Sequence, residues 1–211
     1  MFPRLVSVAA VGVLLLAGTL TLPGQSQRGV KLAAGQFLIA SRRGSDPNFA
    51  QTVILLVPYE QKGVMGLIVN RPSGIPLSRA LQAIEAAKDR TEPVYIGGPV
   101  DMTGAMALLR SRTAPAAGTN VFAGVHLIST RTLLEKTLAA GTPASDLRVY
   151  LGYAGWGEGQ LDMEIGLGLW HVMPAEAGMV FDAQPESLWT RLIGRFEGLR
   201  ARLNPVFGPE L

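Results

Sequence analysis

The chain has 211 residues, 48% of them hydrophobic and 17% charged, so it can bury the core of one ordinary domain and does not have the composition of a disordered protein. Its formal net charge is only +3 and its basic residues are scattered, which does not favour nucleic acid as a partner. The absence of cysteine from the sequence excludes disulfide frameworks, thiolate metal sites and thiol nucleophiles.

An apolar leader opens the chain. Residues 5–22 carry no charge and follow Arg4, which is the layout of a secretory signal. A cleavage step after Ser26 fits removal of the leader, whereas its length also suffices for a membrane anchor. We therefore expect a signal peptide or N-terminal membrane anchor over residues 1–26, and an exported, periplasmic or inner-membrane-anchored protein that touches the membrane only through this segment, if it stays uncleaved. A start site placed too far upstream would instead leave a cytoplasmic protein that begins near Lys31.

The domain is expected to span residues 31–204, with a short tail at 205–211, and its first half is predicted to be mainly strand. Apolar and β-branched runs predict strands over 33–40, 52–57, 64–69 and 93–96. The second and third of these are separated by a short polar turn and are expected to pair as a hairpin. A turn follows the first strand at residues 45–48. The spacing of apolar residues predicts a helix over 77–88.

The second half mixes strands with helices. Residues 101–109 fit either a short helix or a strand, and 111–120 have the composition of a loop. Further strands are predicted over 122–128, 147–151 and 161–170. One helix is predicted to start at a capping-box pattern in Thr132–Glu135 and to end at Gly141, and a last helix with a broad apolar stripe covers 186–203. Strands grouped mostly as hairpins, with helices spaced irregularly among them, indicate an α+β fold.

The sequence contains none of the standard motifs of catalysis or nucleotide binding. His126 and His171 are its two histidines, and both lie in strand-like surroundings that favour structural roles. No G-x-S-x-G, G-x-G-x-x-G, GK[ST] or H-E-x-x-H pattern is present. We therefore expect no catalytic residue, no cofactor and no metal, although a triad built from distant residues would escape such a search.

Two groups of charged residues have both a functional and a plain interpretation. On a strand, Asp162 and Glu164 would share one face, where a close pair can supply a general acid or half of a divalent-cation site. The alternative is an ordinary solvated strand face. Four arginines on the last helix can attract anionic lipid or nucleic acid, or simply keep that face soluble: Arg191, Arg195, Arg200 and Arg202.

The run LGYAGWGEGQL, at residues 151–161, combines four glycines with Tyr153 and Trp156. Glycines beside large rings either let another segment pack closely or shape a shallow binding surface. Together with Glu164, this run resembles the signature G-Y-A-G-W-x-x-G-Q-L-x-x-E of the YqgE/AlgH family. Other landmarks of that family follow in order at 35–40 with the D-x-x-F turn at 46–49, at 66–72, at 95–100, and around Trp170 and Trp189.

The resemblance covers nearly the whole chain from Lys31 to Leu199 and implies an α+β fold with a small barrel-like, largely antiparallel sheet flanked by helices. It implies little chemistry, since the family has no settled catalytic residues or cofactor, and one branch is linked to regulation of alginate production. Two features depart from the family pattern. Tyr59 stands where a histidine is common, and the apolar leader is foreign to a family regarded as cytoplasmic.

These observations favour a non-enzymatic binding or regulatory module with an unknown protein or small-molecule partner. If the motif loops converge in space, its surface consists of Asp46, Asn48, Phe49, Asn70, Arg71, Gly97, Gly98, Tyr153, Trp156, Gln160 and Glu164. The first alternative is a hydrolase-type enzyme that uses Asp46, Asp162 or Glu164 as acid or base. The second is a DNA-associated transcriptional regulator, for which the sequence offers no recognition helix with adjacent basic residues.

Overall fold

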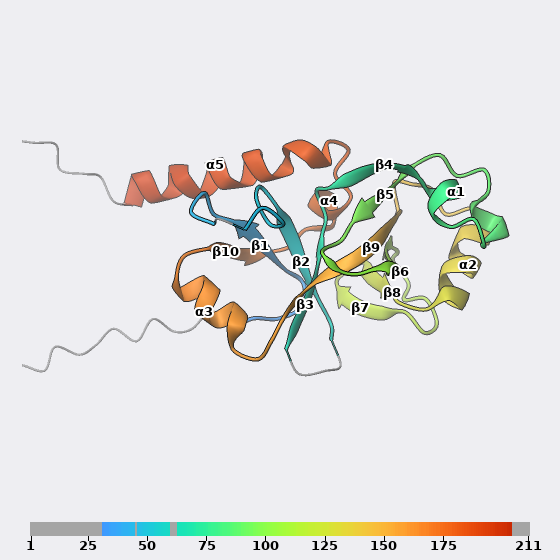
Figure 1. Cartoon of the computed structure of the whole chain (residues 1–211), viewed down its shortest axis with the longest axis horizontal. Helices are drawn as coiled ribbons and strands as arrows, with labels where there is room; N and C mark the ends of the chain where they lie inside the picture. Colours follow the sequence, from blue (N-terminus) through green and yellow to red (C-terminus); the bar gives the residue numbers. More distant parts are fainter. Residues whose placement is uncertain (1–30, 45, 60–62, 204–211) are drawn as a thin grey trace, which may run out of the picture. The chain divides into compact units, whose positions relative to one another are not determined.

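The computed structural model describes residues 31–44, 46–59 and 63–203 (Figure 1). The leader expected over 1–26 and the tail expected over 205–211 lie outside these residues, so both stay predictions. Among the helices of the described ranges, none combines the length and the apolar character that a membrane crossing requires.

A strongly curled sheet forms the centre of the domain. Its strands within the described ranges are β1 (Gln36–Ala40), β2 (Val53–Val57), β3 (Val64–Ile68), β4 (Pro72–Pro76), β5 (Pro93–Ile96), β6 (Val100–Arg110), β7 (Thr119–Phe122), β8 (Val125–Ile128), β9 (Leu147–Trp156) and β10 (Trp170–Pro174). The main path runs β10-β1-β2-β3-β9-β6-β8-β7, and β5 joins β4 to β9 beside it. The β5–β9 pair is parallel and the other recorded pairs are antiparallel. The expected α+β fold with a largely antiparallel, barrel-like sheet is confirmed.

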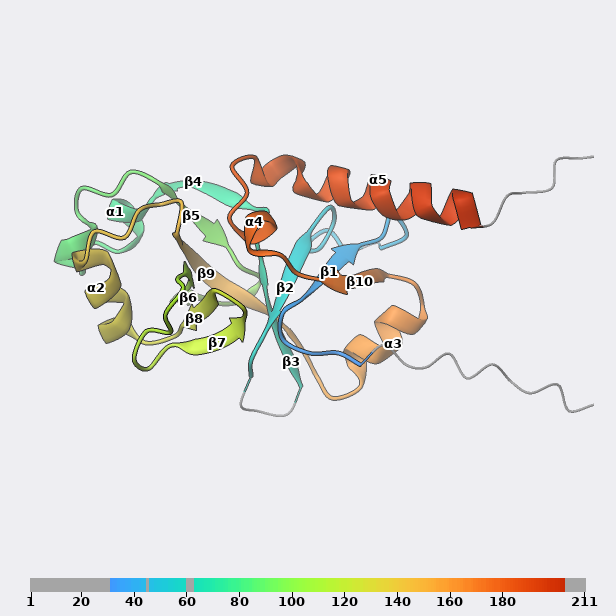
Figure 2. The ribbon, with the colours of Figure 1, turned by 180° about the vertical axis from the view of Figure 1, so that it is seen from behind.

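The helices gather at two ends of this sheet. They are α1 (Leu77–Ala80), the 3₁₀ turn η1 (Glu85–Ala87), α2 (Arg131–Ala139), α3 (Gln160–Gly166), α4 (Ala177–Val180) and α5 (Pro185–Leu203). Both views place α5 and α3 on opposite sides of the β1–β10 pair, while α1 and α2 lie at the other end, near β4 to β6 (Figure 1, Figure 2). Two hydrophobic clusters form the core: the larger extends from β1–β3 and α5 to buried residues of β5 to β9, and the smaller lies between α1, α2, β6, β8 and β9.

Strand β9 joins the two ends. Its first half pairs with β6 and β5, and its second half pairs with β3, where Ala154 lies opposite Gly66. Between the halves, Gly152 has φ +70°, and a Cβ atom there would lie 2.5 Å from the carbonyl oxygen of Gly98. A side chain at this position would be strained in both conformation and space. This glycine therefore lets β9 pass close to the Gly97–Gly98 segment before it pairs with β3.

Most strands lie where the sequence predicts them, but several helical boundaries differ. The helix expected over 77–88 is reduced to α1 and η1, separated by a short non-helical stretch. Residues 101–109 are part of the strand β6. The strand expected over 122–128 and the end of the preceding loop form the hairpin β7–β8, with Gly124 in its turn at φ +76°. Helix α2 begins one residue before the expected capping box, and Glu135 pairs with Arg131 instead of capping the helix.

The strand predicted over 161–170 is wrong, because residues 160–166 form the helix α3. The apolar residues at every second position suggested a half-buried strand, but Leu161 and Ile165 also fit helical spacing, at i and i+4. Leu161 is buried and Ile165 packs against the core, whereas Met163 and Leu167 are 62% and 64% exposed. The exposed Met163 and Leu167 completed an alternation of apolar residues that is typical of a strand, although neither side chain belongs to the core.

Candidate functional site

The site begins where β9 ends and α3 starts. Gly159 stands at the N-terminal boundary of α3 with φ +74°, a conformation that glycine adopts without strain. The helix that follows places Gln160 and Glu164 on one face, four residues apart. The Gln160 side-chain amide donates to Glu164 Oε1 at 3.0 Å, and Gln160 Oε1 accepts from the backbone N–H of Gly157 at 3.1 Å. The Gln160 side chain therefore connects the turn at Gly157 to Glu164 in α3.

Glu164 is the centre of the site. Its Oε2 atom accepts hydrogen bonds from the indole N–H groups of Trp156 at 2.9 Å and Trp170 at 2.7 Å. With the bond from Gln160, three neutral donors hold this carboxylate. Among the residues that the structure describes, no basic side chain forms an ion pair with it. The carboxylate is therefore fixed in place while its negative charge is left without a counter-charge.

Three aromatic rings stand around this carboxylate. The Phe49 ring stacks on Trp156 with centroids 6.1 Å apart and meets Trp170 edge-on at 5.8 Å. The two indoles meet each other edge-on at 5.9 Å. Such offset and edge-to-face arrangements are the favourable ones for aromatic rings. Phe49, Trp156 and Trp170 come from a loop, from β9 and from β10, so three separate segments build one aromatic cluster.

The cluster forms one wall of a hollow of about 170 Å³, which we call the aromatic hollow. It is lined by Ala40, Ser41, Gly44, Asp46, Phe49, Ala50, Gly155, Trp156, Gln160, Glu164, Leu169 and Trp170. Asp46 brings a second carboxylate, which is exposed and accepts the backbone N–H of Asn48 at 2.8 Å. The hollow thus combines aromatic and acidic groups.

Asn70 and Arg71 fix the loop that carries Phe49 through hydrogen bonds to its backbone. Asn70 is buried, accepts the N–H of Val53 at 2.8 Å and donates to the carbonyl of Gln51 at 2.9 Å. Arg71 donates to the carbonyl of Asn48 at 2.8 Å, and burial lowers the pKa of its guanidinium. Both side chains point to the loop backbone and do not line the aromatic hollow. They position the site and are not part of its surface.

Gly97, Gly98 and Tyr153 lie apart from the hollow. A Cβ atom on either glycine would overlap the backbone of β9, so both positions need glycine for close packing. Tyr153 is three residues before Trp156 on the same strand and points to the opposite face. Burial and the neighbouring Tyr59 raise the pKa of its phenol.

Of the residues predicted to share a surface, the structure therefore brings together Asp46, Phe49, Trp156, Gln160 and Glu164. Asn48 contributes backbone contacts to the turn, and the remaining predicted residues support the fold or face elsewhere. The expectation that Asp162 and Glu164 project side by side is wrong, because positions i and i+2 of a helix do not share a face. Asp162 is exposed and does not line the hollow.

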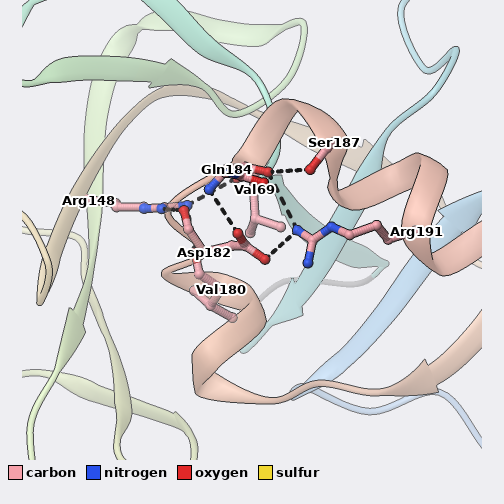
Figure 3. Close-up of polar contacts among 7 residues, drawn as sticks. All are labelled: Val69, Arg148, Val180, Asp182, Gln184, Ser187 and Arg191. Carbon is pink, nitrogen blue, oxygen red and sulfur yellow. Dashed lines mark hydrogen bonds and ion pairs between the residues drawn. The ribbon is translucent and has the colours of Figure 1, made fainter.

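Sequence reasoning missed two residues. In the sequence Trp170 has no signal beyond its match to a family landmark, although its indole N–H donates to the same carboxylate as that of Trp156. Arg148 is buried within the apolar strand β9, where its guanidinium stacks over the Tyr95 ring at 4.7 Å. It donates to the carbonyl of Val180 at 2.8 Å and to that of Asp182 (Figure 3). An arginine inside an otherwise apolar strand was the available signal.

The two histidines lie outside the aromatic hollow and contact backbone or aromatic groups. His126 is buried, with Nε2 3.2 Å from the carbonyl oxygen of Ser111. His171 stacks on the ring of Phe196 at 5.0 Å. Within the described ranges, no three His, Asp or Glu side chains are grouped as a metal ion would require.

Comparison with known proteins places this architecture in a family. The model of the AlgH-like family matches residues 37–200. A UPF0301 protein of Xanthomonas campestris is 37% identical over 166 residues, which cover 77% of this chain and 88% of the relative. UPF0301 protein AlgH of Pseudomonas aeruginosa is 37% identical over 155 residues, or 71% of this chain and 81% of the relative.

Solved structures agree with the sequence comparison. The solution structure of AlgH from Pseudomonas aeruginosa has a TM-score of 0.66 at 30% identity and covers 88% of this chain and 99% of its own. A crystal structure of a protein from Corynebacterium diphtheriae has a TM-score of 0.65 at 23% identity, covering 78% and 87%, and so shares the fold. The chain belongs to the AlgH-like family.

Proposed function

We propose that this protein is a non-enzymatic binding module whose ligand site is the aromatic hollow, and that the ligand presents a cationic group to it. The observation that carries the proposal is the Glu164 carboxylate, which sits among aromatic rings, is fixed by three neutral donors and has no counter-charge among the described residues. A cation with an apolar shell complements both features of such a site.

The physical reason is the combined attraction of a carboxylate and of aromatic faces. A cation over the face of a tryptophan or phenylalanine ring gains roughly 0.5–2 kcal/mol, more when water is excluded. Trp156 and Trp170 are only 4% and 6% exposed, so a ligand can touch only the small ring area that lines the aromatic hollow, and the half-buried Phe49 offers the more accessible ring. The second carboxylate, on Asp46, adds attraction of the same sign at the rim.

The carboxylates support binding better than catalysis. A general acid or base has to exchange a proton with the substrate and must be within hydrogen-bond reach of it. Glu164 instead directs its oxygens to Trp156, Trp170 and Gln160, and these bonds hold the aromatic cluster together. The hydrolase and DNA-binding alternatives drawn from the sequence have no comparable arrangement in their favour.

Isothermal titration of the purified full chain with choline and with 3,3-dimethylbutan-1-ol tests the proposal. The two compounds have nearly the same shape, but only choline is charged. We expect choline to bind at least about tenfold more tightly, a ratio that corresponds to about 1.4 kcal/mol. Equal binding of the two compounds, or no binding of choline, would contradict the proposal.

Two variants connect that result to the hollow. Glu164→Gln removes the charge, and we expect it to weaken choline binding about tenfold. Glu158→Gln is the matched control, because Glu158 is an exposed acid in the same glycine-rich turn and does not line the hollow. This control should bind choline within about twofold of the wild type. Equal losses in the two variants would mean that only the general negative field of the protein matters.

A further inference from the structure

We infer that the ligand is a small zwitterion, with its cationic group in the aromatic hollow and its anionic group on Arg43. This inference rests on the proposed function and names the chemical class of the ligand. It is drawn from a second hollow that borders the first one and has the opposite charge.

The second hollow has a volume of about 310 Å³, and we call it the basic hollow. It is lined by Ser41, Arg42, Arg43, Ile165, Gly168, Trp170, His171 and Glu197. Ser41 and Trp170 also line the aromatic hollow, so the two hollows are neighbours that share two lining residues. A ligand with two charged ends would have to extend past Ser41 and Trp170 to occupy both hollows.

Some charged side chains of the basic hollow already form ion pairs within the protein, and others do not. Arg42 forms an ion pair with Glu197, with Nε 2.7 Å from Oε1, and lies over the Trp189 ring at 5.1 Å. His171 stacks on Phe196 and lies near enough to Glu197 to help lower the pKa of that carboxyl, an effect in which the hydrogen bond from Arg42 is the largest contribution. Arg42 and Glu197 therefore largely neutralise each other.

Arg43 is the cation that remains. Its guanidinium makes no hydrogen bond or ion pair with any residue of the described ranges, and its side chain is exposed. The backbone N–H of Arg43 donates to Ser41 Oγ at 3.3 Å, within the turn that follows β1. Its Nη1 atom lies 4.0 Å from where a Cβ atom on Gly168 would stand, so the guanidinium extends over the connection between α3 and β10.

The two hollows together fit a ligand that carries both charges. A pure cation is attracted only by the carboxylates of the aromatic hollow, and a pure anion is attracted only by Arg43. A zwitterion meets attraction at both ends. The volumes agree, since the aromatic hollow alone is smaller than the roughly 300–1,000 Å³ of typical ligand pockets and the adjoining basic hollow supplies the missing space.

The test compares ligands that share one cationic group. The full chain is titrated with choline, trimethylammonioacetate, 4-trimethylammoniobutanoate and phosphocholine, which place a carboxylate or a phosphate at increasing distance from the cation. We expect at least one zwitterion to bind about fivefold or more tightly than choline. If choline binds and every zwitterion binds equally or more weakly, the inference is overturned while the proposed function stands. If none of the four binds, both fall.

Arg43→Gln then assigns the gain to its residue. In this variant the preferred zwitterion should bind no better than choline does. Arg112→Gln is the control, because Arg112 is an exposed arginine on the β6–β7 connection that lines neither hollow, and it should keep the wild-type ratio. A ratio that survives Arg43→Gln, or that is lost equally in Arg112→Gln, would overturn the assignment.

Free solutes and lipid headgroups can carry the same pair of charges. Co-sedimentation of the full chain with phosphatidylcholine vesicles, with and without free phosphocholine as competitor, separates the two sources. Sedimentation that phosphocholine reverses and Arg43→Gln abolishes supports the inference with a headgroup as ligand. Binding of the free zwitterion without sedimentation supports it with a soluble ligand. Sedimentation that Arg43→Gln does not change is independent of the two hollows and counts against the inference.

Discussion

Replacing Glu164 with leucine removes the acceptor that both indoles of the aromatic cluster share. Trp156 and Trp170 are 4% and 6% exposed, so their N–H groups would be left without a partner in a largely dry environment. A buried donor that loses its partner costs about 1–3 kcal/mol. The leucine variant should therefore lose roughly 2–6 kcal/mol of unfolding free energy, a large share of the about 5–15 kcal/mol of a typical domain.

Glutamine at the same position keeps an oxygen for the two indoles and removes only the charge. We expect Glu164→Gln to be at least about 2 kcal/mol more stable than Glu164→Leu, since neutral hydrogen bonds are weaker than charge-assisted ones but still satisfy the donors. Urea unfolding followed by tryptophan fluorescence measures both values on the full chain. If the leucine variant equals the glutamine variant or exceeds the wild type in stability, the indole–carboxylate contacts do not hold the cluster.

Three further predictions use the same unfolding assay. Arg148→Met leaves the carbonyls of Val180 and Asp182 without their donor and should lower the unfolding free energy by about 2–4 kcal/mol. A variant as stable as the wild type would show that the buried guanidinium does not stabilise the fold. Gly152→Ala should lower the unfolding free energy by about 2 kcal/mol or more, and Gly155→Ala by less than about 1 kcal/mol, because of these two glycines only Gly152 has a positive φ. Equal losses in the two variants would contradict this explanation. Burial acts to raise the pKa of Asp182, but hydrogen bonds from Arg191 and from a backbone N–H outweigh it, so that pKa lies below its usual value. The ionised Asp182 carboxylate therefore stabilises the folded protein fully above about pH 5, and this contribution is lost as the pH falls through the folded-state pKa. The difference in unfolding free energy between the wild type and Asp182→Asn should shrink between about pH 5 and pH 2, and a constant difference would refute the prediction.

Much of the fold was predictable because its strands have local signals. The β-branched run of β2 and the turn before β3 set a hairpin within a few residues. The glycine at position 141, with φ +71°, ends α2 as the sequence indicates. Helix α3 was not predictable by the same means, since its alternation of apolar residues fits a strand while its burial follows Leu161 and Ile165. Tertiary packing decides between two periods that the local pattern leaves open.

The candidate site was predictable in part for a similar reason. Phe49, Trp156 and Glu164 belong to motifs that the sequence analysis singled out, and the structure brings them together. Which motif residues line the hollow and which only support the loop depends on the direction of each side chain, which the sequence does not give. Asn70 has the same polar character as a ligand-binding residue, yet both ends of its amide bind the loop backbone. Arg43 had no motif at all, and its relation to the hollow appears only when β1 and β10 pair.

The most direct test of the cation site is a two-dimensional ¹H–¹⁵N NMR titration of the full chain with choline, read at the indole N–H signals. The chain has three tryptophans, and the third, Trp189, does not line the aromatic hollow itself, but its indole N–H donates at 2.8 Å to the carbonyl of Ala40, which does. We expect the Trp156 and Trp170 signals to move in a saturable manner and the Trp189 signal, one residue further from the ligand, to move clearly less. Three unmoved signals, or an equal shift at Trp189, would contradict the account.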